Sequence, residues 1–191
     1  MANVFEGRLV RLRAVEAADW ERFYASNQDT DSARLTHYIR FPSSREQVRA
    51  WTEGLATGGA QDDVFRFKIE RLDGEYVGTL NTHSADRRSG TFRYGLAILP
   101  EQRRKGFASE AIWLVLRYFF WELRYQKVNA VVYAFNEPSI RLHERLGFVL
   151  EGRLRRMIYT AGHHHDALIY GMTREEFEAS GWDGLARGSL S

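Results

Sequence analysis

Residues 96–108 read LAILPEQRRKGFA and join an apolar strand to a helix through a short cationic loop. The loop holds Arg103, Arg104, Lys105 and Gly106, and a helix is expected to begin directly after it. The N-terminus of a helix carries unpaired N–H groups and about half a positive charge, so it favours anions. Gly106 lets the backbone approach a phosphate closely. The pattern indicates an anion site, and the alternative is a solvated basic loop that follows a strand.

The same loop lacks the signatures of the common nucleotide sites. It contains one glycine, so it is not a dinucleotide fingerprint, and it has no GxxxxGK[ST] pattern of a P-loop. An anion at this loop would therefore be bound differently from the phosphates of a P-loop or a dinucleotide-binding site.

Alternating and helical apolar patterns predict the elements on either side of the loop. Strands are expected at 8–15, 64–72, 75–83, 91–99, 128–135, 148–160 and 164–172, and helices at 17–27, from Ser44, at about 106–123, between Pro138 and Gly147, and at 174–180. The strand–helix–strand unit at 91–134 implies a parallel pair with a right-handed crossover. We expect an α/β fold with a mixed, strongly twisted central sheet and helices on both faces, in one domain with a core at about 8–172 and a tail at 173–191.

Three local signals refine this arrangement. Asp73-Gly74 between two apolar runs predicts a hairpin. Gln47 is placed to form a capping box with Ser44, and Val48, Trp51 and Leu55 would form the inner stripe of that helix. The helix at 106–123 is apolar nearly all round, so it must be covered on more than one side.

Composition narrows the class of protein. The chain has 191 residues, no cysteine and a net charge of +2, which excludes disulfides and thiolate chemistry and disfavours nucleic-acid binding. No apolar stretch is long enough for a membrane span or a secretory signal, so we expect a cytoplasmic protein that binds no membrane.

Two motifs together resemble one enzyme family. The run P-x-x-R-x-x-G-x-A from Pro100 to Ala108 looks like the pyrophosphate motif of the GNAT acetyltransferases, and GFASEA is similar to their ribosomal-protein N-terminal acetyltransferase branch. From Asn136, NEPSIRLHERLGF resembles the second signature of the family. The resemblance covers about residues 8–172 and implies the GNAT acyl-CoA N-acyltransferase fold, with acetyl-CoA as co-substrate and an amine as acceptor.

The resemblance also implies which residues contact the coenzyme. The backbone of the cationic loop and of the first helical turn would hold the pyrophosphate: Arg103, Arg104, Lys105, Gly106, Phe107 and Ala108. The backbone near Ala97 and Ile98 would pair with the pantetheine amides. Asn136 follows a strand and offers both a donor and an acceptor to an amide-bearing arm, or else it caps the next helix.

Ser139 and His143 are the candidate catalytic residues. They are four apart and share one helix face, and a hydroxyl or imidazole near the sulfur would help the departing thiolate. By resemblance, His143 stands where many family members carry a tyrosine proposed as general acid. Imidazole donates a proton only when it is charged or in the right tautomer, so Ser139 is the better candidate. Each can also be a cap or packing residue.

A general base is not evident. The strand TFRYGLAIL at 91–99 contains no carboxylate, although family members often carry a glutamate there. Deprotonating an α-amine at pH 7 costs about 1.4 kcal/mol, against about 4.6 kcal/mol for a lysine-type amine. A site without a strong base therefore favours a peptide N-terminus or an amino-acid-like acceptor.

The sequence thus predicts an N-acetyltransferase that works by direct attack, with a peptide N-terminus or a small amine, such as an amino acid, polyamine or amine-bearing antibiotic, as acceptor. The alternative is a catalytically weak acyl-CoA-binding regulatory module. We expect a homodimer, because the 111–123 helix carries more aromatic surface than one sheet face needs. We expect no metal, since adjacent strand residues such as His163, His164 and His165 point to opposite faces. Tyr38, Phe41 and Pro42 would wall the acceptor pocket or pack in the core.

Overall fold

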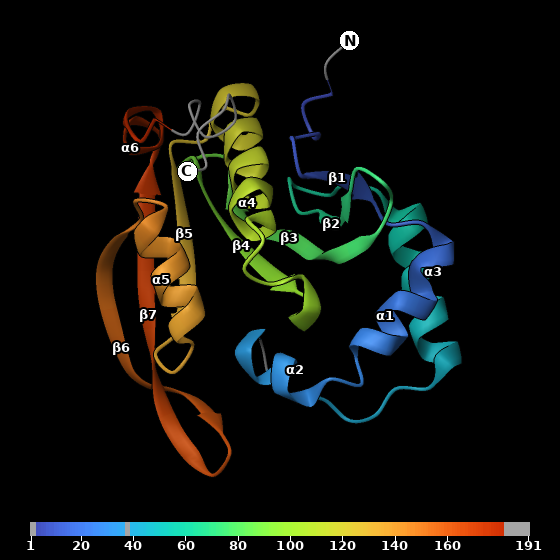
Figure 1. Ribbon diagram of the computed structural model, residues 1–191. Coiled ribbons are helices and arrows are strands. Elements are labelled where there is room, and N and C mark those ends of the chain that lie inside the picture. The colour runs from blue at the N-terminus through green and yellow to red at the C-terminus, as the bar shows by residue number, and fades with distance from the viewer. Residues whose placement is uncertain (1–2, 37–38, 182–191) are drawn as a thin grey trace. The chain divides into compact units, whose positions relative to one another are not determined.

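The computed structural model describes residues 3–36 and 39–181, and a seven-stranded sheet carries the fold (Figure 1). The strands are β1 (Val10–Ala14), β2 (Arg66–Arg71), β3 (Tyr76–Asp86), β4 (Thr91–Ile98), β5 (Lys127–Tyr133), β6 (Val149–Thr160) and β7 (His163–Thr173). Their order is β1-β2-β3-β4-β5-β7-β6. β4 and β5 run parallel, whereas β1 with β2, β2 with β3, β5 with β7 and β6 with β7 are antiparallel. The expected mixed sheet and its parallel pair are confirmed.

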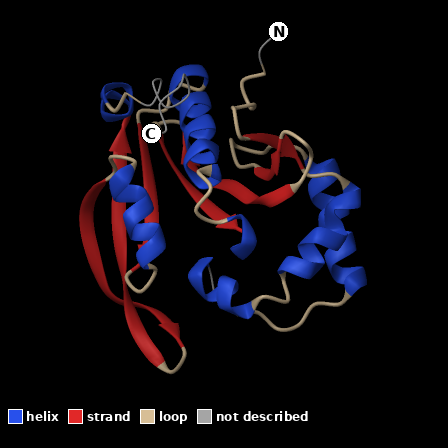
Figure 2. Ribbon diagram, in the orientation of Figure 1, coloured by secondary structure: helices blue, strands red, loops and turns tan. Residues whose placement is uncertain are grey.

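Helices lie between β1 and β2, between β4 and β5 and between β5 and β6, and a last helix follows β7 (Figure 2). They are η1 (Ala17–Asp19), α1 (Trp20–Ser26), α2 (Thr30–Thr36), α3 (Arg45–Gly58), η2 (Pro100–Gln102), α4 (Phe107–Arg117), the π-helical η3 (Tyr118–Glu122), α5 (Glu137–Arg145) and α6 (Arg174–Ala179). None of those in the described ranges is long and apolar enough to cross a membrane.

By its internal contacts the chain divides into two compact units. The first consists of residues 1–83 and 95–111, and the second of residues 84–94 and 112–191. The strand β4 and the helix α4 each contribute residues to both units. A single domain with a tail at 173–191 stays a prediction, and residues 182–191 of that tail lie outside the described residues.

In the first unit, α1 and α3 close a small apolar core. Val15, Phe23, Val48 and Tyr76 are buried there, with Tyr24, Leu55 and Leu99 packed against them. The capping box of α3 is confirmed, since Ser44 Oγ accepts from the Gln47 amide and Gln47 Oε1 accepts from the Ser44 amide.

The predicted inner stripe of α3 is wrong at one position. Trp51 is 45% exposed, and the fully buried residue is its neighbour Thr52. Thr52 can be buried because its hydroxyl donates to the Val48 carbonyl at 2.8 Å. Trp51 instead meets the edge of Phe23, with the Arg66 guanidinium 5.4 Å from the centre of its ring.

Helix α2 is an element that the sequence patterns did not predict. Its sequence TDSARLT buries no residue, so it has no apolar stripe to detect. The Asp29 carboxylate starts the helix by accepting from the amides of Asp31 and Ser32, at 3.1 and 3.0 Å.

Phe41, expected to pack in the core or wall a pocket, is 95% exposed, and its companion Tyr38 lies outside the described residues.

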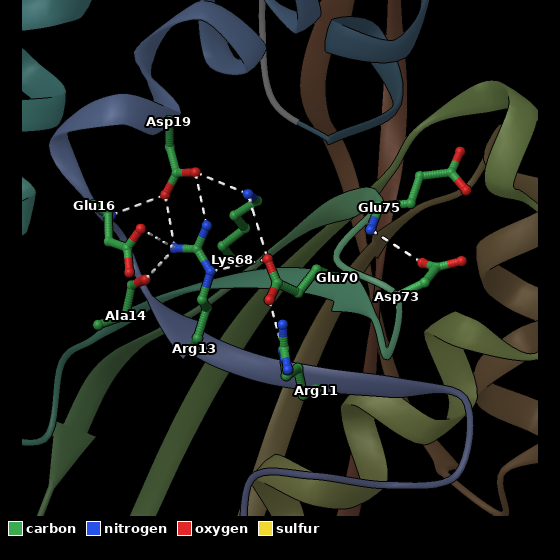
Figure 3. Close-up of polar contacts among 9 residues, drawn as sticks. All are labelled: Arg11, Arg13, Ala14, Glu16, Asp19, Lys68, Glu70, Asp73 and Glu75. Atoms are coloured by element: carbon green, nitrogen blue, oxygen red, sulfur yellow. Dashed lines mark hydrogen bonds and ion pairs between the residues drawn. The ribbon is translucent and has the colours of Figure 1, made fainter.

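Five charged side chains form a network between β1, β2 and η1 in the first unit (Figure 3). Asp19, Lys68 and Glu70 are buried. Arg13 donates to both carboxylates, with each of three bonds measuring 2.9 Å. Arg11 bonds Glu70 at 2.6 Å, and Lys68 bonds Asp19 at 2.8 Å. These alternating charges hold the first two strands to the helix that follows.

The second unit has an aromatic core beneath the end of the long helix. Phe92 of β4 stacks on Phe119 at 4.0 Å and meets Phe120 and Tyr125 edge-on. The expected helix at 106–123 is α-helical to Arg117 and continues as a π-helical turn to Glu122. Residues 111–116, 119 and 120 of this segment are all buried within the chain.

Candidate functional site

The cationic loop has the backbone geometry that an anion site requires. Helix α4 begins at Phe107, directly after Gly106 as predicted, and Phe107 is buried. Gly106 has φ +84° and Arg104 has φ +63°, so the chain reverses sharply before the helix. Gly106 tolerates this conformation, whereas a side chain with a branched β-carbon does not. The side chains of Arg103, Arg104 and Lys105 are exposed.

The three cations of the loop differ in their partners. Arg103 Nε donates to the Ile98 carbonyl at 3.1 Å, and a terminal nitrogen donates to Ser32 Oγ at 2.6 Å. Lys105 Nζ donates to Gln102 Oε1 at 3.2 Å. Within the described part of the chain, no hydrogen bond or ion pair engages the Arg104 side chain. Arg103 thus shapes the loop, while Arg104 presents its charge to solvent.

The end of β4 presents one backbone edge to β3. A β-carbon on Gly78 would lie 2.0 Å from the Ala97 carbonyl oxygen, and the Leu99 amide donates to the Val77 carbonyl at 2.9 Å. Ala97 and Leu99 therefore face β3, and because strand residues alternate, the backbone groups of Ile98 face away from it. The described pairs of β4 with β5 end at Arg93.

Asn136 begins helix α5 in the second unit. Its side-chain oxygen accepts from the Ser139 amide at 3.2 Å, and Pro138 occupies the first turn. The capping role that the sequence left open is therefore present. Whether Asn136 also contacts a coenzyme stays a prediction.

His143 is buried on α5, and both of its ring nitrogens have partners. Nδ1 lies 2.7 Å from the Ser139 carbonyl oxygen, which can only accept, so Nδ1 carries the proton. Nε2 lies 2.9 Å from the Tyr94 hydroxyl and accepts from it. Burial lowers the pKa of His143, against the smaller opposite effect of the bond to Ser139. Burial also raises the pKa of Tyr94, so both groups are neutral at pH 7.

Ser139 lies one turn before His143 and is half-buried. Its hydroxyl is 3.4 Å from His143 Nδ1, which is long for a hydrogen bond. The proton of that nitrogen is already donated to the Ser139 carbonyl, so this contact is weak. The predicted pair does share a helix face. Both ring nitrogens of His143 form hydrogen bonds within the chain, whereas the Ser139 hydroxyl still has a proton to donate.

Two residues of these surroundings were not singled out from the sequence. Tyr94 is the partner of His143, and the only signal was its place on the apolar face of its strand. Glu110, in the GFASEA run, accepts from three backbone amides of residues 8–10. A carboxylate in the first turn of a helix was its only signal.

The three consecutive histidines point to different neighbours. His164 packs on Tyr159 at 4.9 Å and His165 on Phe135 at 4.7 Å, as the alternation of a strand requires. No group of three or more His, Asp or Glu residues within ranges 3–36 and 39–181 is arranged to hold a metal ion.

Comparisons with known proteins identify the family. Residues 9–149 match the family described as acetyltransferase (GNAT) domain. The chain belongs to the GNAT acetyltransferase family. Its predicted fold, and its predicted class as an acetyl-CoA-dependent N-acetyltransferase, are confirmed at that level.

Several relatives of this GNAT chain are named acetyltransferases. The SPbeta prophage-derived uncharacterized N-acetyltransferase YokL of Bacillus subtilis (strain 168) is 46% identical over 172 residues, which cover 90% of this chain and 94% of YokL. YdaF of the same organism, provisionally named a ribosomal N-acetyltransferase, is 32% identical over 88% of this chain and 93% of its own length. The spermidine N(1)-acetyltransferase of Escherichia coli (strain K12) is 30% identical over 83% of each chain.

Among solved structures, the fold is similar to that of spermidine N-acetyltransferase from Vibrio cholerae in complex with CoA and spermine. The TM-score is 0.77 at 22% identity, and the match covers 88% of this chain and 98% of the other. At this identity the likeness supports the GNAT fold and leaves the acceptor undecided. YdaF supports the ribosomal branch that GFASEA suggested.

Proposed function

We propose that this GNAT enzyme binds acetyl-CoA at the cationic loop and transfers the acetyl group directly to an amine. The observation that carries the proposal is the abrupt start of α4 after Gly106, with the exposed charge of Arg104 beside it. Helix N–H groups and a cation together favour a pyrophosphate. The backbone from Arg103 to Ala108, including Lys105 and Phe107, would hold it.

The end of β4 would hold the pantetheine arm. The backbone groups of Ile98 face away from β3, so its N–H is placed to bond an amide or to polarise the thioester carbonyl. Arg103 already occupies the Ile98 carbonyl. Ala97 would then contribute by positioning Ile98 rather than by its own backbone bonds. Asn136 remains our candidate for a residue that bonds an amide of the coenzyme.

Ser139 is our candidate for the proton donor to the leaving thiolate. His143 is neutral, buried and bonded at both nitrogens, so donating a proton would cost it the bond to the Ser139 carbonyl. It serves better as a positioning residue for α5. The chain has no cysteine to carry the acetyl group, and no Ser-His-Asp order stands out in the sequence, so we expect direct transfer.

Two observations bear on the class of amine that accepts the acetyl group. The absence of a carboxylate on 91–99 favours an α-amine, such as a peptide N-terminus or an amino acid. The spermidine acetyltransferase relative favours a polyamine, and an amine-bearing antibiotic is a further small acceptor. Because an α-amine costs less free energy to deprotonate at pH 7 than an ε-amine does, we place α-amines first among these acceptors.

Turnover with a panel of amines tests the proposal. Because the protein has no cysteine, a thiol reagent reports released coenzyme A without any background from protein thiols. Acetyl-CoA with a peptide N-terminus, an amino acid, spermidine or an aminoglycoside should release coenzyme A in at least one case. Binding of acetyl-CoA without turnover on any amine would instead support a regulatory acyl-CoA-binding module.

We also propose a cytoplasmic homodimer that binds neither nucleic acid nor membrane. The aromatic residues of the 111–123 segment are mostly buried within the chain, so they no longer support a dimer. Support comes from β6, the last strand of the sheet order, where exposed apolar side chains gather: Val149, Leu150, Leu154, Met157 and Tyr159. Light scattering that gives a 22.2 kDa particle at micromolar concentration would contradict the dimer.

A further inference from the structure

Glu110 holds the segment that precedes β1 against the first turn of α4. Its two carboxylate oxygens accept from three consecutive backbone amides, those of Arg8 at 2.8 Å and of Leu9 and Val10 at 2.7 Å each. Hydrogen bonds to an ionised carboxylate are short and strong, as these are. One side chain therefore fixes the course of three residues that lie about a hundred positions earlier in the chain.

The Glu110 carboxylate lies so close to the backbone of Gly7 that a side chain at position 7 would have to displace it. A β-carbon on Gly7 would lie 2.4 Å from the Glu110 carboxyl carbon, a distance at which something must shift. The carboxylate is thus seated directly on the backbone, with no layer of side chains between them.

The same segment supports the cationic loop. A β-carbon on Gly106 would lie 3.2 Å from Leu9 Cδ1, so the Leu9 side chain touches the turn at which α4 begins. Glu110 bonds the Leu9 amide, and Leu9 backs Gly106. The chain of contacts runs from the first turn of α4 through the N-terminal segment and back to the loop.

We propose that Glu110 is a positioning residue for coenzyme binding. Its carboxylate and the backbone amides of residues 8–10 that it bonds form a cradle. This cradle presses Leu9 against the Gly106 turn that receives the pyrophosphate. The inference rests on the proposed function. Neither the motif nor the family match assigns this residue a part in binding.

The direction in which coenzyme affinity changes when the Glu110 charge is removed distinguishes this positioning role from simple electrostatic repulsion. Coenzyme A is polyanionic, so deleting a carboxylate close to its phosphates should strengthen binding through reduced repulsion. Glu110→Gln keeps the size of the side chain but removes the charge that three amides share. If the carboxylate positions the loop, the same deletion weakens binding instead.

Calorimetric titration of coenzyme A onto wild type, Glu110→Gln and Glu101→Gln measures this sign. Glu101 is an exposed residue of η2, which leads into the cationic loop, so its change removes a carboxylate charge without touching the bonds that Glu110 makes. We expect Kd to rise by about tenfold or more for Glu110→Gln and to stay equal or fall for Glu101→Gln. At saturating acetyl-CoA, kcat of Glu110→Gln should stay near that of wild type.

Two further variants keep the inference testable if Glu110→Gln folds poorly. Leu9→Ala retains every amide that Glu110 bonds and removes the side chain that contacts Gly106, and the Kd of this variant should also rise. Glu110→Ala opens a carboxylate-sized space lined by three N–H groups, so added acetate should restore coenzyme affinity, and chloride at equal ionic strength should not.

The outcomes are distinguishable. A wild-type chain that does not bind coenzyme A overturns the proposed function and this inference with it. A wild type that binds, with Glu110→Gln and Leu9→Ala binding equally well, overturns the inference alone. Weaker binding by Glu110→Ala that acetate leaves unchanged also overturns it, since the loss would then come from general destabilisation.

Discussion

Removing the charge of Asp19 should destabilise the protein far more than removing that of Lys68, although the two form one ion pair. Asp19 accepts two bonds from Arg13, one from Lys68 and one from the Glu16 amide, and it is buried. Asp19→Asn leaves the network with three cations and one carboxylate. Lys68→Met leaves two of each sign, Arg11 and Arg13 with Asp19 and Glu70 (Figure 3).

The magnitude follows from burial and from the pKa of the carboxyl. Burial alone raises the pKa of Asp19, but the bonds from Arg13 and Lys68 lower it from 3.8 to about 2. That difference corresponds to about 2 kcal/mol of stability at neutral pH. Breaking a buried pair on one side costs about 3–5 kcal/mol, because the partners keep uncompensated charge. We expect about 3 kcal/mol for Asp19→Asn and about 1 kcal/mol for Lys68→Met.

Urea denaturation at pH 7 measures the loss of unfolding free energy in both variants. Glu53→Gln, which breaks the exposed ion pair with Arg49, is the control, and we expect it to cost under about 0.5 kcal/mol. A carboxyl with a depressed folded pKa stabilises above its unfolded pKa and loses this effect as pH falls through the folded value. The gap between wild type and Asp19→Asn should therefore narrow from about pH 4 towards pH 2.

Two results would refute this reasoning. If Asp19→Asn matches the surface control, the network contributes nothing beyond its exposed members. If Lys68→Met costs as much as Asp19→Asn, the balance of charge is not what decides the energy.

Three other predictions concern the candidate site. Gly106→Val cannot adopt φ +84° without strain, so the rise in melting temperature on adding acetyl-CoA should be lost, and an unchanged rise in a folded variant would remove the loop from the site. Ser139→Ala should lower kcat about a hundredfold with coenzyme affinity kept, and full turnover would end its role as acid. Burial lowers the folded pKa of His143, so unfolding should become easier as pH drops below about 6.5, and His143→Gln, measured by denaturation, should flatten that decline.

Local chemistry along the chain determined most of the elements and the family. The hairpin at Asp73-Gly74 formed where predicted, with the Gly74 amide donating to the Arg71 carbonyl. The start of α4 at Phe107 and the capping box at Ser44 were equally readable. Each is fixed by residues within a few positions of one another, so the sequence contains the whole cause.

Only the tertiary structure decided how distant groups pair. Nothing in the sequence links Glu110 to the amides of residues 8–10, or Tyr94 to His143, because these contacts join elements far apart in the chain. The tautomer and neutrality of His143 follow from those partners and from burial. The exposure of Trp51 has the same origin: helical periodicity names the apolar residues, but the neighbouring elements determine which face they cover.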